Sequence, residues 1–213
     1  MSARFYPIML DLRARPCLVI GGGAVAERKV GGLVDAQASV TVVSPTLTTR
    51  LVAWAADGTI RHVARAYRAG DLADFALAFV ATGDTSLNEA VAAEGCARGR
   101  WVNAADAPEH CDFVLPSVLR RGALVIAVAT GGTSPALARS VRQELETHIR
   151  AEYGVLAEIA GEVRRELRAG GVRVDPETWR SALGAEVRRL IADNRRDEAK
   201  ALLRRTLEIT RCA

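Results

Sequence analysis

The sequence has few of the residues that several functions require. No run of apolar residues approaches the length that a membrane span needs, which is about 18 residues. Residues Met1–Pro7 lack the pattern of a secretory signal. The four cysteines form no CxxC pair and no zinc-type spacing, and the three histidines are scattered. Aromatic residues make up only 5% of the chain, which argues against nucleic-acid binding. We therefore expect a cytoplasmic protein with free thiols, no membrane segment, no recognisable metal cluster and no nucleic-acid partner.

Lysine is nearly absent from a chain that carries a net charge of +4. Only Lys29 and Lys200 are lysines among the 29 basic residues, and the others are arginines. Residues 1–113 carry 11 basic and 12 acidic residues, whereas residues 114–213 carry 18 basic and 13 acidic residues. The basic second half suggests an anionic partner, although a solvated helical surface would show the same excess.

Short apolar runs alternate with helical patterns through the first half of the chain. This alternation predicts an α/β fold in which a Rossmann-like parallel sheet is covered by helices on both faces. The expected strands are Cys17–Ile20, Ser39–Val43, Ile60–Arg65, Ala76–Ala81 and Trp101–Ala104, and the expected helices are Ala24–Asp35, Thr46–Ala56 and Thr85–Arg98.

The pattern changes after Asp112, and we place domain boundaries near residues 113 and 150. One apolar strand is expected over Ala123–Ala129, followed by a helix from Pro135 to Arg150 that Ser134 caps. From Ala151 onward we expect only helices. Their apolar faces are marked by Leu156, Ile159, Val163 and Leu167, by Trp179, Leu183, Val187 and Leu190, and in a last short helix by Leu202, Leu203 and Leu207.

A glycine loop stands between the first expected strand and the first expected helix. Residues Gly21–Ala26 fit G-x-G-x-x-A, and the strand, loop and helix come in the order that gives this motif its meaning. The glycines permit a tight turn and a close approach of pyrophosphate, which the amides of the helix N-terminus attract. We predict a dinucleotide site formed by Gly21, Gly22, Gly23, Ala24, Val25, Ser44, Pro45, Thr46 and Thr82.

The ribose end of this site lacks its usual acid. The segment Val43–Thr46 follows the second expected strand, where an acidic residue would bind the ribose hydroxyls. The segment contains neither an acid nor an arginine for a 2′-phosphate. The ribose must therefore rely on Ser44, Thr46 or backbone groups, and these residues leave the choice between NAD and NADP open.

Further short motifs follow one another along the chain: Tyr6–Ile8, Gly21–Lys29, Val42–Pro45, Ala81–Asp84, Val102–Pro108, Cys111–Phe113 and Thr130–Arg139. Together they closely resemble the siroheme synthase dehydrogenase/ferrochelatase family, also called precorrin-2 dehydrogenases. The resemblance spans about residues 4–150 and is more specific than the glycine loop alone.

This resemblance implies NAD-dependent oxidation of precorrin-2 to sirohydrochlorin, and some members of the family also insert ferrous iron to form siroheme. It implies a homodimer in which residues 1–113 form the NAD-binding Rossmann domain, residues 114–150 a dimerisation and substrate segment, and residues 151–213 a helical domain.

Two positions depart from the family pattern. Gly83 stands where a second acid is usual, and Thr130 stands where serine is frequent but keeps the hydroxyl.

Asp106 is the first candidate for catalysis. It follows the last expected strand of the sheet, at the edge where open α/β sheets bind their ligands. It also aligns with the acid to which the family's catalytic role is attributed, so we predict that Asp106 is a general base. A turn acceptor before Ala107 and Pro108 is the alternative. His110 is the second candidate, although a solvated loop histidine fits this position equally well.

A second glycine and hydroxyl loop precedes the helix expected from Pro135. Its amides could bind a substrate carboxylate, and a capped turn between strand and helix is the alternative. Arg139 could add a guanidinium, with Arg120, Arg121 and Arg142 as further candidates. The predicted substrate-binding residues are Thr130, Gly131, Gly132, Thr133, Ser134 and Arg139.

Two classes of function compete at this stage. The leading hypothesis is an NAD-dependent dehydrogenase whose partners are precorrin-2 and sirohydrochlorin. The rival is a Rossmann module that senses NAD without catalysis, and it predicts a chain without Asp106 and the second glycine loop, both of which are present. The residues do not decide whether ferrous iron is a further substrate, because the tetrapyrrole itself supplies the nitrogen ligands.

Overall fold

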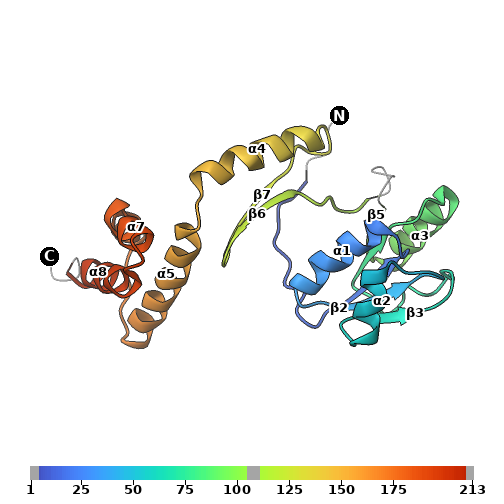
Figure 1. The fold of residues 1–213 in the computed structure, drawn as a ribbon, viewed down its shortest axis with the longest axis horizontal. Helices are drawn as coiled ribbons and strands as arrows, with labels where there is room; N and C mark the ends of the chain where they lie inside the picture. Colours follow the sequence, from blue (N-terminus) through green and yellow to red (C-terminus); the bar gives the residue numbers. More distant parts are fainter. Residues whose placement is uncertain (1–4, 105–110, 210–213) are drawn as a thin grey trace. The chain divides into compact units, whose positions relative to one another are not determined.

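The computed structural model describes residues 5–104 and 111–209 and divides the chain into two compact units (Figure 1). The first unit spans residues 1–115 and the second spans residues 116–213. This division lies two residues from the boundary expected at 113, and the boundary expected at 150 falls inside the second unit. None of the helices in the described ranges is long and apolar enough to cross a membrane.

The first unit contains a parallel sheet with the strand order β3-β2-β1-β4-β5, which confirms the predicted Rossmann-like α/β fold. The strand order reverses between β1 and β4, the place where such sheets bind ligands. The elements are β1 (Pro16–Ile20), α1 (Ala24–Asp35), β2 (Ser39–Val43), α2 (Thr49–Ala56), β3 (Arg61–Val63), β4 (Leu77–Val80), α3 (Thr85–Arg98) and β5 (Trp101–Ala104).

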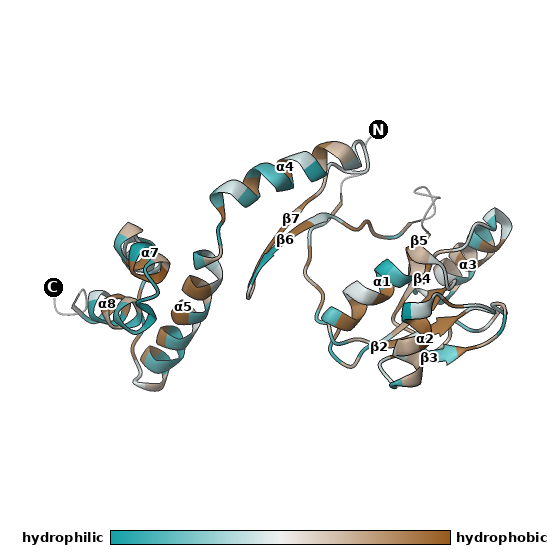
Figure 2. Cartoon of the chain, in the orientation of Figure 1, coloured by the Kyte–Doolittle hydropathy of each residue, from teal (hydrophilic) through white to brown (hydrophobic). Residues whose placement is uncertain are grey.

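Alternate residues of β1 enter two different cores, because side chains alternate between the faces of a strand. Cys17 and Val19 pack in the core that includes residues of α1 and α2, whereas Leu18 and Ile20 pack in the core that includes Val91 of α3. Figure 2 shows much of this sheet in brown, the colour of hydrophobic residues. Burial raises the pKa of the Cys17 thiol to about 11, so this cysteine is a protonated core residue.

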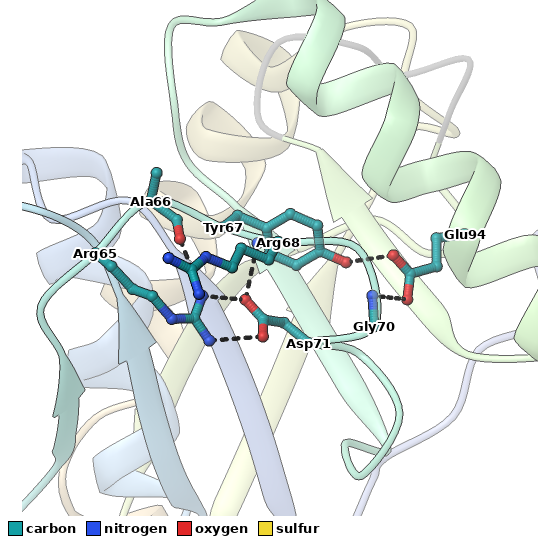
Figure 3. Close-up of polar contacts among 7 residues, drawn as sticks. All are labelled: Arg65, Ala66, Tyr67, Arg68, Gly70, Asp71 and Glu94. Atoms are coloured by element: carbon teal, nitrogen blue, oxygen red, sulfur yellow. Dashed lines mark hydrogen bonds and ion pairs between the residues drawn. The ribbon is translucent and has the colours of Figure 1, made fainter.

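Two carboxylates fasten the long connection between β3 and β4 (Figure 3). The guanidinium of Arg65 donates to both carboxylate oxygens of Asp71, at 2.7 and 2.8 Å. The Tyr67 hydroxyl and the Gly70 N–H donate to the two oxygens of Glu94 on α3, at 2.7 and 3.0 Å. These bonds hold the connection against α3 and satisfy its polar groups.

We expect the Asp71→Asn variant to lose about 1–2 kcal/mol of unfolding free energy at pH 7, because a bidentate pair and a charged acceptor for the Arg68 N–H are weakened. Hydrogen bonding from Arg65 holds the pKa of Asp71 below its usual value. The carboxylate therefore stabilises the fold above the ordinary aspartate pKa, and this contribution fades as the pH falls through the folded-state pKa. Urea unfolding should show a smaller difference between the two proteins at pH 3 than at pH 7. An equal difference would contradict the ion pair.

The second unit begins with a β-hairpin that the sequence pattern reveals only in part. Strands β6 (Ser117–Arg121) and β7 (Leu124–Val128) pair in antiparallel fashion, and Gly122 in the turn has a φ of 54°. The expected strand at Ala123–Ala129 corresponds to β7. The pattern misses β6 because this strand buries only Leu119 and ends in two arginines, so no apolar run marks it.

Helices form the rest of the second unit as far as residue 209: α4 (Pro135–His148), α5 (Glu152–Ala169), α6 (Pro176–Ala182), α7 (Ala185–Ala192) and α8 (Arg196–Ile209). The helix expected around Trp179 and Leu190 is in fact two helices, because α6 ends before Leu183 and Gly184 is the N-cap of α7. The last helix is also longer than expected. Helices α5 to α8 share one core, to which Ile159, Val163 and Leu203 contribute fully buried side chains.

Candidate functional site

The glycine loop leaves the carboxyl end of β1 and runs directly into α1 (Figure 1). Gly21 has a φ of 113°, and a Cβ there would lie 2.4 Å from the carbonyl oxygen of Ala81. A Cβ at Gly22 would lie only 1.9 Å from the carbonyl oxygen of Thr46. Both positions therefore require glycine, the first for its backbone conformation and both for the close approach of a neighbouring chain segment.

Hydrogen bonds fasten the glycine loop to the segment that follows β2. The Gly21 N–H donates to the Val43 carbonyl at 3.0 Å, and the Thr48 N–H donates to the Gly22 carbonyl at 2.9 Å. The Thr48 hydroxyl also donates to the carboxylate of Glu27 in the first turn of α1, at 2.6 Å. The loop is thus shaped by protein contacts alone, which reduces the entropy lost when a ligand binds.

The N-terminus of α1 is open where phosphates would bind. Gly23 is the N-cap, and no side chain caps this helix end. A Cβ at Gly23 would meet no atom of the described residues within 4 Å, and the following residues Ala24 and Val25 are exposed. The first amides of a helix carry partial positive charge and point away from its end. The described residues therefore fit the pyrophosphate of a dinucleotide.

The predicted ribose-binding residues lie in the segment after β2, where one of them is buried and the others are exposed. Ser44 is only 5% exposed, and its hydroxyl donates to the Thr46 carbonyl at 2.7 Å. Its own carbonyl oxygen lies 2.9 Å from Nε2 of His62. Pro45 and Thr46 are exposed. Ser44 therefore shapes the loop, and Thr46 carries the predicted hydroxyl that lies at the surface.

Thr82 lies beside the glycine loop, where the chain leaves β4. Its methyl carbon would be 3.5 Å from a Cβ at Gly21. Its hydroxyl donates to Oδ1 of the buried Asn88 at 2.8 Å and accepts the N–H of Asp84 at 3.3 Å. Asp84 in turn caps α3 through the N–H of Leu87. The first turn of α3 thus fixes Thr82 next to the predicted cofactor loop.

An amide and a lysine connect α1, the sheet and the segment that follows β5. Asn103 is 8% exposed; its Oδ1 accepts Nζ of Lys29 at 2.7 Å, and its Nδ2 donates to the Phe113 carbonyl at 2.9 Å. The Lys29 ammonium also lies 4.8 Å from the ring centroid of Phe79. The rings of Phe79 and Phe113 meet edge to face at 5.4 Å. These contacts satisfy the buried amide and hold Phe113 against the sheet.

The predicted catalytic residues, Asp106 and His110, lie outside the described residues. The chain is well anchored on both sides of them. The Cys111 thiol donates to the carbonyl of Ala104 at 3.1 Å, and Asp112 exchanges two hydrogen bonds with the backbone of β5, at 2.8 and 2.9 Å. Asp112 is therefore a structural acceptor, and Ala104 and Cys111, the described residues on either side of the two candidates, are in contact.

Sequence patterns did not identify Lys29 and Asn103 as residues of this region. Two signals pointed toward them. Lys29 is one of two lysines in a chain that otherwise uses arginine, and Asn103 is an amide inside a short apolar strand. A buried amide in a strand needs hydrogen-bond partners, but the sequence does not show that one partner lies 74 residues away.

Hydroxyl groups hold the second glycine loop together. The Thr130 hydroxyl donates to the Ser134 carbonyl at 2.9 Å, and the Thr133 hydroxyl donates to the Thr130 carbonyl at 2.6 Å. The Ser134 side chain caps α4, as predicted. Gly131 and Gly132 have φ values of 63° and 84°. The hydroxyls are thus engaged within the turn, and the glycine amides are its better donors for an anion.

The four candidate arginines of the second unit differ in their surroundings. Arg121 donates to the backbone carbonyl that follows α4 at 3.0 Å, and Arg142 pairs with Glu146 at 2.6 Å. Arg120 and Arg139 are exposed and form no ion pair with any described residue. Arg139, the arginine predicted to bind substrate, is therefore available to an anion, and Arg121 is a structural residue.

Comparisons with known proteins agree with these features. Residues 8–117 match the family described as "Putative NAD(P)-binding", and residues 121–148 match "Sirohaem biosynthesis protein central". The chain is 48% identical over 162 residues to a siroheme synthase of Methylobacillus flagellatus, which covers 76% of this chain and 35% of that protein. It is 39% identical over 207 residues to a siroheme synthase of Nitrosococcus oceani, covering 96% of this chain and 44% of that protein.

A solved structure extends the comparison over nearly the whole chain. The protein named SirC, precorrin-2 dehydrogenase, matches with a TM-score of 0.73 and 26% sequence identity, and the match covers 95% of this chain and 98% of that one. The chain spans less than half the length of the two siroheme synthases.

Proposed function

The chain belongs to the family described as "Putative NAD(P)-binding", and we propose that it uses NAD to oxidise precorrin-2 to sirohydrochlorin. The observation that carries the proposal is the rigid glycine loop at the open N-terminus of α1. The structural match to a precorrin-2 dehydrogenase, which covers 95% of the chain, supports the choice of substrate. We assign the enzyme to the cytoplasm, in keeping with the free thiols of Cys17, Cys96 and Cys111.

NAD supplies the hydride acceptor when it is bound. The amides of Gly23, Ala24 and Val25 would hold its pyrophosphate at the start of α1. Thr46 is the exposed hydroxyl that meets the ribose, and Thr82 borders the loop on the side of β4. The segment after β2 carries neither an acid for the ribose hydroxyls nor an arginine for a 2′-phosphate, so the choice of NAD rests on the family resemblance.

The remaining residues act on the tetrapyrrole. The substrate is a polycarboxylate, which suits the Arg139 guanidinium and the amides of Gly131 and Gly132. Oxidation removes a hydride and a proton from the substrate. Asp106 would accept the proton as general base, with His110 as the second candidate.

The test is an assay of the purified protein with precorrin-2 and NAD in the absence of oxygen. We expect the absorbance of NADH and of sirohydrochlorin to rise together, and a reaction without precorrin-2 serves as the control. A folded protein that binds NAD but produces no NADH above this control would disprove the enzyme hypothesis. The rival function, an NAD-sensing module, would then be favoured.

We further propose that the protein is a homodimer that pairs through β6, β7 and α4. A two-stranded sheet is marginal by itself in water. Val118 on β6 and Leu137 on α4 are 37% and 54% exposed, and most of β7 is only partly covered. Contacts with a second copy would remove this apolar surface from water.

Light scattering should therefore give twice the chain mass of 22.8 kDa. We expect Leu137→Glu to shift the protein toward the monomer, because it places a charge in the apolar contact. The matched control is Val52→Glu at an equally exposed position on α2, which should leave the mass unchanged. A monomeric wild-type protein would disprove the dimer.

The proposal does not extend to iron insertion. Within residues 5–104 and 111–209 no three His, Cys, Asp or Glu side chains gather as a metal site. Ferrous iron would be a substrate held by the tetrapyrrole nitrogens, and no observation on the described residues favours that second activity.

A further inference from the structure

A wide groove lies in the helical part of the second unit, between α5, α6 and the connection that joins them. Its volume is about 1290 Å³. Ala157, Ala160 and Gly161 of α5 are small and leave space along one stretch of the groove. Trp179 and Leu183 are partly buried in its floor and pack on the core of α5 to α8. The groove thus offers a broad apolar surface in a part of the chain that the proposed chemistry does not use.

The charged residues that line this groove are all arginines: Arg164, Arg168, Arg173 and Arg180. Arg180 pairs with Glu177, whereas the other three form no ion pair with any residue that the structure describes. Arg164 and Arg168 lie one turn apart on α5, where like charges destabilise a helix. An anion bound between them would remove this repulsion.

Two acids of α5, Glu162 and Glu166, form ion pairs with residues of α8. Glu162 binds both Lys200 and Arg196 of α8, at 2.8 and 2.5 Å, and Glu166 also binds Lys200 at 2.8 Å. The hydrogen bonds from Lys200 and Arg196 lower the pKa of Glu162 to about 2. Glu162 and Glu166 are therefore fixed toward α8, and neither of them pairs with Arg164 or Arg168.

We infer that this groove binds a flat organic polycarboxylate whose apolar body covers Trp179 and whose carboxylates pair with Arg164, Arg168 and Arg173. Guanidinium groups match carboxylates in a bidentate geometry, and aromatic side chains stack on flat rings. The groove exceeds the range of roughly 300–1,000 Å³ that drug-sized ligands occupy, so it has room for a macrocycle.

The identity of the ligand as a tetrapyrrole rests on the proposed function. Both the substrate and the product of that reaction are flat-bodied polycarboxylates. The groove is then a second binding site, apart in sequence from the glycine loop at 130–134, that holds a tetrapyrrole before or after oxidation. A second copy of this chain is a poorer occupant, because it would bring a net positive charge to an arginine rim.

The test is a titration of the full chain with uroporphyrin, a stable tetrapyrrole polycarboxylate, followed by its absorbance. We expect the variant Arg164→Gln/Arg168→Gln to bind one equivalent of uroporphyrin fewer per chain than the wild type binds. The matched control, Arg189→Gln/Arg205→Gln, removes two exposed arginines of α7 and α8 that do not line the groove and should bind as the wild type does. Equal binding by all three proteins, or equal loss in both variants, would overturn the inference.

Two further measurements test whether the apolar surface contributes to binding and whether the groove is instead a contact between copies. Benzenehexacarboxylate, a flat polyanion with a small body, should not displace uroporphyrin at equal concentration; full displacement would overturn the role of the apolar floor. Light scattering should give the same mass for the groove variant and the wild type, and a lower mass for the variant would instead make the groove a contact between copies.

The dehydrogenase assay distinguishes this inference from the proposed function. The groove variant should keep the wild-type kcat with saturating precorrin-2, because the groove residues lie outside the proposed catalytic machinery. A protein that produces NADH but shows no binding dependent on Arg164 and Arg168 would disprove the inference alone. A protein that binds uroporphyrin in the groove but produces no NADH would disprove the dehydrogenase alone.

Discussion

The Gly23→Ala variant should remain folded and lose at least about 1.4 kcal/mol of NAD binding free energy, which is about tenfold in affinity. The backbone of Gly23 has a φ of −86°, which alanine adopts without strain, and within residues 5–104 and 111–209 the added Cβ would meet no atom within 4 Å. The methyl group would instead fill the open space at the N-terminus of α1. A pyrophosphate must approach the backbone closely at this position, so the variant loses affinity without losing structure.

The neighbouring glycine supplies the matched control. At Gly22 the added Cβ would lie 1.9 Å from the Thr46 carbonyl, so the protein itself must shift. Overpacking of this kind costs about 1–3 kcal/mol of stability. Thermal unfolding without NAD should therefore show a clear loss for Gly22→Ala and almost none for Gly23→Ala, and calorimetry measures the affinity of each for NAD. Unchanged NAD affinity in the Gly23 variant would place the cofactor elsewhere.

The features that the sequence predicted well are local ones. The glycine loop, its strand and its helix are adjacent in the chain, so the motif and the apolar patterns place α1 at Ala24–Asp35 and β2 at Ser39–Val43, as the structure has them. Helix caps are equally local, and Ser134 was predicted from the proline that follows it. Such features depend on neighbours within a few residues, which a pattern records directly.

The features that escaped prediction depend on contacts across long stretches of chain. Lys29 meets Asn103 only because α1 and β5 both pack on the sheet. Ser44, Thr46 and backbone groups were the alternatives for the ribose, and the sequence did not show that the Ser44 hydroxyl donates to the Thr46 carbonyl. Strand β6 is defined by its pairing with β7 and carries too few apolar residues to be recognised by itself. In each case the partner, and not the residue type, decides the role.

The structure shows which arginines of the basic second half are paired with acids and which are not. Several arginines of the basic half belong to intrahelical or interhelical pairs, as Arg142 and Arg196 do. Excess charge remains at the groove of α5 and α6 and at Arg139. A chain whose cofactor is held by amides can keep its unpaired guanidinium groups for the carboxylates of the substrate.

The Asp106→Ala variant should bind NAD as the wild type does and lose about 10²- to 10⁴-fold in kcat, the usual contribution of a general base. Asp106 follows β5 by two residues, and no residue of the glycine loop depends on it for its described hydrogen bonds. Without the carboxylate, the reaction loses the proposed general base for the proton that leaves precorrin-2. NADH absorbance gives kcat, and calorimetry gives the NAD affinity.

The variant Asp112→Asn separates the chemistry of Asp106 from the shape of the segment that carries it. Asp112 binds the backbone of Val102, and asparagine keeps an acceptor oxygen for that bond, so kcat should stay within about threefold of the wild type. Equal losses in both variants would mean that the segment needs its carboxylates for structure. An unchanged kcat in Asp106→Ala would remove Asp106 from the mechanism and leave His110 as the candidate, which the pH profile of a His110→Gln variant would then test.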